Sequence, residues 1–190
     1  MNKNDALRIK KGITMLFLTA FSFLVFFPSL LFSQNINKGY FNRTKLALLP
    51  GVGDNGSAFH QSGTEISNVN GWYVNSRLAL GIGVGIVPYV NPTITTIPVF
   101  GNVNYSLRDK KSTPYLFGNL GYSFLTNSHT SGGLLAEIGT GWQFKLGRKS
   151  FIGPEIGYRH QKYRIQYYDG PDGSVGDQLN ALSIGVTIRF

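Results

Sequence analysis

The stretch LNALSIGVTIRF, residues 179–190, ends the chain with two kinds of side chain in alternation. Large apolar residues take every second position, and small or polar residues take the positions between them. The apolar set is Leu182, Ile184, Val186, Ile188 and Phe190. Successive side chains of a β-strand point to opposite faces of the sheet. The pattern therefore predicts a terminal strand with one apolar face and one small or polar face.

The start of the chain predicts export. Residues 1–11 are basic, and Ile13–Phe27 is a mostly apolar segment of 15 residues that stops at Pro28. This arrangement is typical of a secretory signal peptide, whereas a helix that spans a bilayer needs about 20 apolar residues. We predict a cleavable signal peptide over residues 1–33 and a single mature domain over residues 34–190.

Two-residue periodicity continues through the mature chain, with turn signals between the segments and no convincing helical period. We predict eight antiparallel strands. They cover residues 40–50, 64–74, 77–89, 93–107, 114–125, 132–146, 150–167 and 179–190. An exported chain of such strands is predicted to be all-β, an up-and-down transmembrane barrel with apolar faces toward lipid and polar faces toward the lumen. The alternative is a soluble, lipocalin-like barrel, whose apolar faces would point inward.

The connections and the aromatic residues favour the membrane barrel. Residues 75–76, 108–112 and 147–149 are tight, basic turns, whereas the connections at the other end are mostly longer, as expected for periplasmic turns and outer loops. Two aromatic belts are predicted. Near the tight turns lie Trp72, Tyr105, Trp142, Phe144 and Phe190, and near the other end lie Tyr89, Tyr122, Phe124, Tyr163 and Tyr167.

In the strand 77–89, glycine alternates with aliphatic residues. Gly81, Gly83 and Gly85 share one face of this strand. Because glycine weakens an ordinary strand, three of them on one face predict close contact with large residues of neighbouring strands inside a narrow barrel. Dinucleotide-binding loops use a similar glycine spacing, but no helix pattern follows here.

Four segments resemble the small outer-membrane β-barrel domains of Gram-negative bacteria, the OmpA and OmpX barrels. They are GWYVNSRLALGIGVG (71–85), TTIPVFGNVNYSL (95–107), TPYLFGNLGYSF (113–124) and LSIGVTIRF (182–190). The resemblance implies a location in the outer membrane, among lipid and lipopolysaccharide. It also implies that periplasmic chaperones escort the chain, and that the barrel-assembly machinery recognises the alternating apolar residues that end at Phe190. The outer loops are shorter than those of adhesin-like members of the family.

The net charge of +9 does not predict nucleic-acid binding. Beyond residue 11 the chain holds 14 basic and eight acidic residues, a net charge of +6, spread over strands and tight turns. No basic cluster is interleaved with stacking aromatics. The chain contains no cysteine, which excludes thiol catalysis and thiolate metal sites.

A set of charged residues is predicted to face the lumen. It comprises Glu137, Lys145, Glu155, Arg159 and Arg189, joined by Arg43, Lys45 and Glu65. These side chains predict either an ion path or a filled interior whose charges pair, since an unpaired buried charge is costly. The lumen of an eight-stranded barrel is just wide enough to be filled by side chains, which favours the packed, non-conducting interior.

Other candidate sites are weaker. His129, Ser131 and Glu137 are the residue types of a nucleophilic hydrolase, but nothing in the short loop fixes their geometry. Asp169, Asp172 and Asp177 lie in a glycine-rich loop without the spacing of a calcium-binding loop. We therefore predict no catalysis, no cofactor and no metal. The predicted role is structural or docking of a protein partner at the loops, and the alternatives are a narrow channel or a lipid-modifying enzyme.

Overall fold

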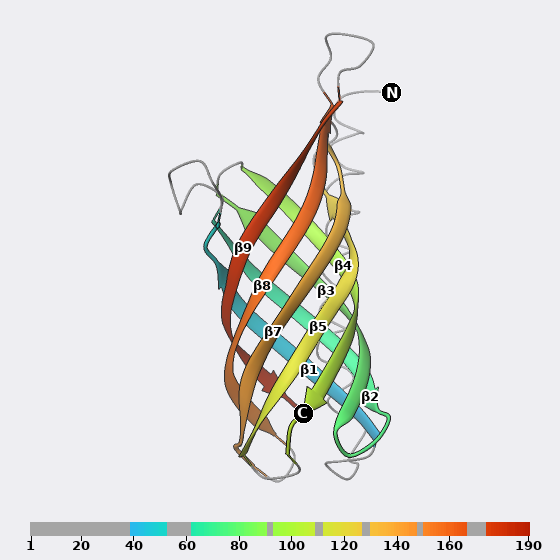
Figure 1. Cartoon of the computed structure of the whole chain (residues 1–190), viewed down its shortest axis with the longest axis vertical. Helices are drawn as coiled ribbons and strands as arrows, with labels where there is room; N and C mark the ends of the chain where they lie inside the picture. The colour runs from blue at the N-terminus through green and yellow to red at the C-terminus, as the bar shows by residue number, and fades with distance from the viewer. Residues whose placement is uncertain are drawn as a thin grey trace, which may run out of the picture. The chain divides into compact units, whose positions relative to one another are not determined.

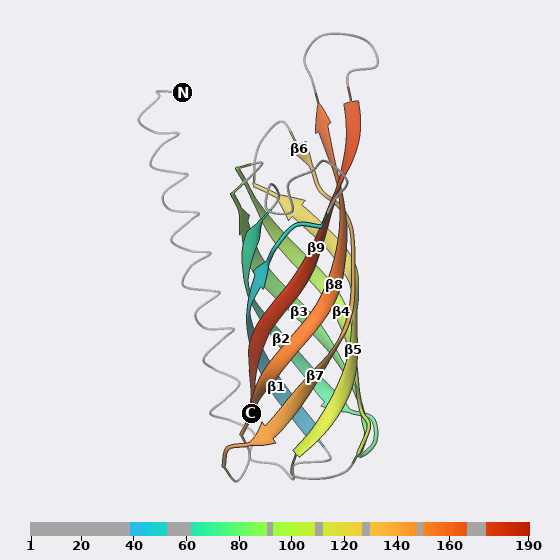
Figure 2. The same cartoon turned by 60° about the vertical axis from the view of Figure 1, so that its left-hand side comes forward.

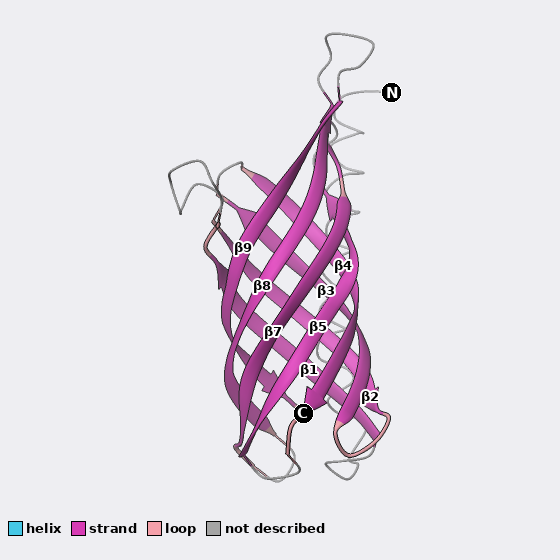
Figure 3. Ribbon diagram, in the orientation of Figure 1, coloured by secondary structure: helices cyan, strands magenta, loops and turns pink. Residues whose placement is uncertain are grey.

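The computed structural model describes residues 39–52, 62–90, 93–108, 112–126, 130–147, 150–166 and 174–190. They form one antiparallel sheet, drawn entirely as strands and connections in Figure 3. Within these residues there is no helix long and apolar enough to cross a bilayer. The predicted signal peptide lies outside the described residues.

Eight long strands and one two-residue strand make up the sheet (Figure 1). In chain order they are β1 (Gly39–Leu49), β2 (Gly63–Tyr73), β3 (Leu78–Tyr89), β4 (Ile94–Ser106), β5 (Ser112–Leu125), β6 (Thr130–Ser131), β7 (Gly133–Lys145), β8 (Phe151–Gln166) and β9 (Ser174–Arg189).

The sheet closes on itself through β1 and β9. Each long strand pairs with the next long strand along the chain, and β9 pairs with both β8 and β1. Asn42 and Phe190 exchange two backbone hydrogen bonds at this seam, of 3.1 and 2.9 Å. Figure 2 shows β1 running beside β9. The predicted closed, eight-stranded antiparallel barrel is confirmed.

Strand boundaries agree with the predicted ones except at the last strand. β9 begins at Ser174, five residues earlier than predicted, because it stays paired with β8 as far as the pair Gln166–Ser174. The prediction of a loop through residue 177 was therefore wrong for residues 174–177. The short β6, which pairs with β8 at Arg164 and Ile165, was not predicted.

The outer face of the barrel is apolar and exposed. Ile82, Leu120 and Ile138 are 70%, 63% and 71% exposed. The terminal strand follows the same rule, since all five of its alternating apolar residues are 38% to 52% exposed while Ser183 and Arg189 are buried. An exposed apolar surface of this extent suits lipid rather than water. It contradicts the lipocalin-like alternative.

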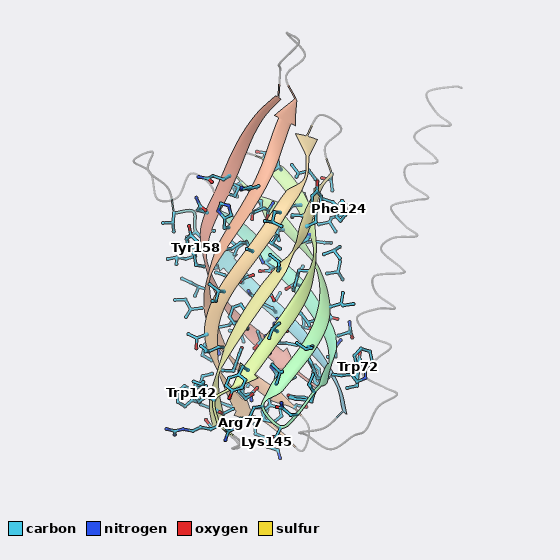
Figure 4. All side chains as sticks on the ribbon, turned by 45° about the vertical axis from the view of Figure 1, so that its right-hand side comes forward. Trp72, Arg77, Phe124, Trp142, Lys145 and Tyr158 are labelled. Carbon is cyan, nitrogen blue, oxygen red and sulfur yellow. The ribbon has the colours of Figure 1, made fainter. Side chains whose placement is uncertain are left out.

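Aromatic side chains gather toward the two ends of this outer face (Figure 4). The exposed ones are Trp72, Tyr105, Trp142, Phe144 and Phe190 near the tight turns, and Tyr122, Phe124 and Tyr158 toward the other end. The prediction for Tyr89 was wrong. Its ring is 3% exposed and lies in the lumen, because the two-residue period puts it on the same face as Gly83 and Gly85. The side chains of Tyr163 and Tyr167 lie outside the described residues.

Inside the barrel, aromatic residues stand opposite glycines of the neighbouring strand. The directly opposed pairs are Phe41–Gly71, Phe100–Gly83, Phe100–Gly121, Tyr115–Gly141 and Phe117–Gly139. A Cβ added at Gly83 would lie 2.4 Å from the Phe100 ring, and one at Gly139 would lie 2.5 Å from the Phe117 ring. The predicted use of glycine beside a large lumen residue is confirmed for Gly83, whereas Gly81 lies against Val69 and Gly85 lies against Ser67.

We expect Gly83→Ala to lower the free energy of unfolding by about 1–3 kcal/mol, because Phe100 must shift inside a filled lumen. The matched control is Gly101→Ala on the outer face, where an added Cβ meets nothing closer than 3.8 Å. Urea unfolding of both variants in lipid vesicles measures the difference. Equal midpoints for the two variants would refute the packing role of Gly83.

Candidate functional site

Six charged side chains meet in the middle of the lumen. We call them the charge cluster: Arg43, Lys45, Glu65, Glu137, Glu155 and Arg159. They come from β1, β2, β7 and β8, which the barrel brings together across its interior. Three cations face three anions, so the cluster carries no net charge when all six groups are ionised.

Lys45 and Arg159 each bind two or more carboxylates of this cluster. Lys45 Nζ lies 2.6 Å from Glu137 Oε1, 3.2 Å from Glu155 Oε1 and 3.5 Å from Glu65 Oε2. Arg159 Nη2 lies 2.8 Å from Glu65 Oε2 and 2.9 Å from Glu137 Oε2. None of these side chains is more than 4% exposed. The pairs are therefore shielded from solvent and salt, and the loss of one member would leave a buried charge.

Neutral side chains complete the cluster. Tyr115 donates its hydroxyl hydrogen to Glu155 Oε2 over 2.7 Å, and Asn119 donates from Nδ2 to Glu137 Oε2 over 3.1 Å. The Phe117 ring lies against the cations, with its centroid 5.3 Å from Lys45 Nζ. This surrounding shell holds the carboxylates and cations in place.

Two of the residues predicted to face the lumen lie outside the charge cluster. Arg189 is buried nearer the tight-turn end, where it donates to the Tyr73 hydroxyl over 2.8 Å and lies 5.3 Å from the centroid of the Phe41 ring. Lys145 does not enter the lumen, which corrects the prediction. It is the last residue of β7 and is exposed, because the strand ends before its side chain reaches the interior.

Apolar side chains fill other parts of the lumen. One buried group is Leu49, Val87, Tyr89, Leu179 and Ala181, and a second is Phe41, Val69, Ala79, Phe100 and Leu135. Leu49, Val87 and Leu135 are 0% exposed. The described interior is thus lined by buried charged, polar and apolar side chains.

A polar patch on the outer face was not predicted as a unit. We call it the amide cluster: Tyr40, Asn42, Thr44, Asn68 and Asn70. Asn42 and Asn68 exchange two side-chain hydrogen bonds of 3.0 Å, and Asn42 also donates to Asn70 over 2.8 Å. The polar residues of β2 have polar partners on β1, which explains how they are accommodated beside lipid.

The catalytic and calcium candidates are not assembled by the described residues. Glu137 is buried in the charge cluster, whereas Ser131 belongs to β6 and His129 lies outside the described residues. Asp177 lies within β9, and the other two aspartates of the calcium candidate, 169 and 172, lie outside the described residues. In the described part of the chain, no group of three metal-binding side chains could hold a metal ion.

The fold matches solved outer-membrane barrels. Neisserial surface protein A shares 13% identity at a TM-score of 0.57, over 80% of this chain and 96% of its own. The N-terminal barrel of Pseudomonas aeruginosa OprF shares 13% identity at a TM-score of 0.51, over 83% of this chain and 100% of its own. OprG from the same organism shares 12% identity at a TM-score of 0.52, over 81% of this chain and 97% of its own. No protein-family description and no curated protein matches the sequence.

One further match is an enzyme. The outer-membrane enzyme PagL shares 12% identity at a TM-score of 0.50, over 76% of this chain and 97% of its own. Barrels of this fold therefore include both enzymes and other proteins, and the fold does not decide between them. Together with the exposed apolar face, the fold is that of a transmembrane β-barrel.

We expect Lys45→Met to lower the free energy of unfolding by about 3–5 kcal/mol, because it leaves an uncompensated carboxylate among buried side chains. Lys145→Met removes the same group from an exposed position and should change stability by less than about 0.5 kcal/mol. Unfolding in lipid vesicles, followed by the fraction of folded protein on unheated gels, compares the two. A small effect of Lys45→Met, similar to that of Lys145→Met, would show that water reaches the charge cluster and screens its charges.

Proposed function

We propose that this chain is an integral outer-membrane barrel with a packed, non-conducting lumen, and that its role in the cell envelope is structural or the docking of a partner. The observation that carries the proposal is the burial of the lumen-facing side chains. A water-filled passage would leave such side chains exposed along its length. Instead, Phe41, Lys45, Leu49 and Gln161, which lie at different heights in the barrel, are 0% to 3% exposed.

The paired extension of β8 and β9 supports a docking role. The backbone pairs from Lys162–Gln178 to Gln166–Ser174 continue beyond the last described pairings of β1 and β7 with these strands. Figure 1 shows the two strands rising above the rest of the barrel. β6 covers part of the β8 edge of this extension, and the projecting strands offer a partner hydrogen-bonded backbone as a docking surface.

Catalysis is the weaker alternative. The carboxylate that a hydrolase would need, Glu137, is held by Lys45 and Arg159 in the lumen. It is 4% exposed, so a substrate at the rim does not reach it. We therefore propose that the chain is not an enzyme.

The terminal strand supports the predicted route of assembly. Its five alternating apolar residues face outward and end at Phe190, beside the seam where the barrel closes. We propose that this strand is the segment that the barrel-assembly machinery recognises, after periplasmic chaperones have delivered the chain.

We expect the purified barrel to produce no conductance steps in planar lipid bilayers, because its lumen admits no continuous water path. A large porin added afterwards to the same bilayer controls for membrane quality. Conductance steps whose ion selectivity changes in the Lys45→Met variant would refute the packed lumen and support the channel alternative. The use of this variant separates steps of the protein from those of a contaminating porin.

A further inference from the structure

The tight-turn end of the barrel carries exposed cations at a regular height. We call Arg77, Arg108 and Lys145 the basic rim. Each is exposed, and none forms an ion pair with another described residue. Figure 4 places Arg77 and Lys145 at the same end as Trp72 and Trp142.

Each cation stands three residues beyond the level of a belt aromatic. Lys145 follows Trp142 by three residues on β7, and Arg108 follows Tyr105 by three residues. At about 3.3 Å per residue and a tilt of about 40°, three residues correspond to roughly 8 Å along the membrane normal. The polar layer on each side of a bilayer is of similar thickness, about 5–8 Å.

Arg77 lies directly before the start of β3, at a similar level. It precedes Leu80 by three residues, and Leu80 stands opposite Trp72 in the β2–β3 ladder. Trp72 and Trp142 are 62% and 42% exposed, as expected for residues at the boundary between hydrocarbon and headgroups. The basic rim therefore lies at the depth of the lipid headgroups.

The turns hold these cations at that height. Asn75 Oδ1 accepts hydrogen bonds from the backbone N–H groups of Arg77 and Leu78, over 2.9 and 2.8 Å. The backbone of Arg108 is bonded to Thr113, which accepts from Arg108 N over 3.1 Å and donates to Arg108 O over 2.9 Å. The basic rim is thus carried by short, hydrogen-bonded connections.

The sequence adds charge of the same sign at this end. The connections from β4 to β5 and from β7 to β8 contain four further cations and one anion: Lys110, Lys111, Arg148, Lys149 and Asp109. The connections and strand tips at the opposite end have the reverse balance, with two cations and four anions. They are Lys162, Arg164, Asp54, Asp169, Asp172 and Asp177. The cations of the barrel surface therefore concentrate at one end.

We propose that the basic rim binds the phosphate groups of anionic phospholipids in the inner leaflet of the outer membrane. The short turns mark this end as periplasmic, so phospholipid headgroups are the anions nearest to it. Clustered Lys and Arg side chains at a membrane surface attract anionic lipids. The inference rests on the position of the barrel in the membrane and not on whether its lumen conducts.

The test compares lipid association of the mature barrel in vesicles of phosphatidylcholine and phosphatidylglycerol with spin-labelled lipids. We expect the wild type to prefer phosphatidylglycerol, Lys145→Gln to lower that preference by up to about fivefold at low salt, and the triple variant Arg77→Gln, Arg108→Gln, Lys145→Gln to abolish it. Lys162→Gln, which removes an exposed cation from the other end, is the matched control and should leave the preference unchanged. A heat-dependent gel shift verifies that each variant is folded.

Three outcomes would overturn the proposal. The first is a preference for phosphatidylglycerol that survives in the triple variant. The second is a rim-dependent preference for lipid A without one for phosphatidylglycerol, which would assign the rim to the outer leaflet. The third is rim-dependent binding of soluble peptidoglycan fragments without lipid selectivity, which would assign it to a periplasmic polymer.

Discussion

Closure of the sheet between β1 and β9 is the constraint on which the rest of the structure depends. A strand edge exposed to hydrocarbon would leave backbone groups without hydrogen-bond partners, and the pairing of β1 with β9 removes both edges. Closure also encloses a narrow interior of set width, which side chains must fill. The opposed aromatic–glycine pairs and the balanced charge cluster are two ways in which the side chains fill this interior.

The residue types on the outer face change along the barrel axis, because the surroundings of this face change from hydrocarbon to headgroups. Aliphatic residues cover the middle, aromatic residues mark the boundaries, and most of the cations outside the lumen gather beyond one boundary. The amide cluster is the exception on this face. Its members satisfy one another, which lowers the cost of placing polar groups beside lipid. Polar groups are thus paired with one another on both faces of the sheet: charged side chains in the lumen and amide side chains on the outer face.

Much of this architecture could be predicted because a two-residue period reports which face each side chain occupies. The lumen positions of Glu137, Glu155 and Arg159 follow from that period alone. Contacts between strands could not be predicted in the same way, because they depend on register and on barrel closure. The pairing of Asn42 with Asn68 depends on the β1–β2 register, and the exposure of Lys145 depends on where β7 ends.

The most direct test of the lipid-facing closed barrel is the gel mobility of the mature protein from the outer-membrane fraction, with and without boiling. A closed barrel that resists detergent is predicted to run faster before boiling than after it. A protein recovered in soluble form without detergent, with the same mobility in both lanes, would contradict the lipid-facing barrel.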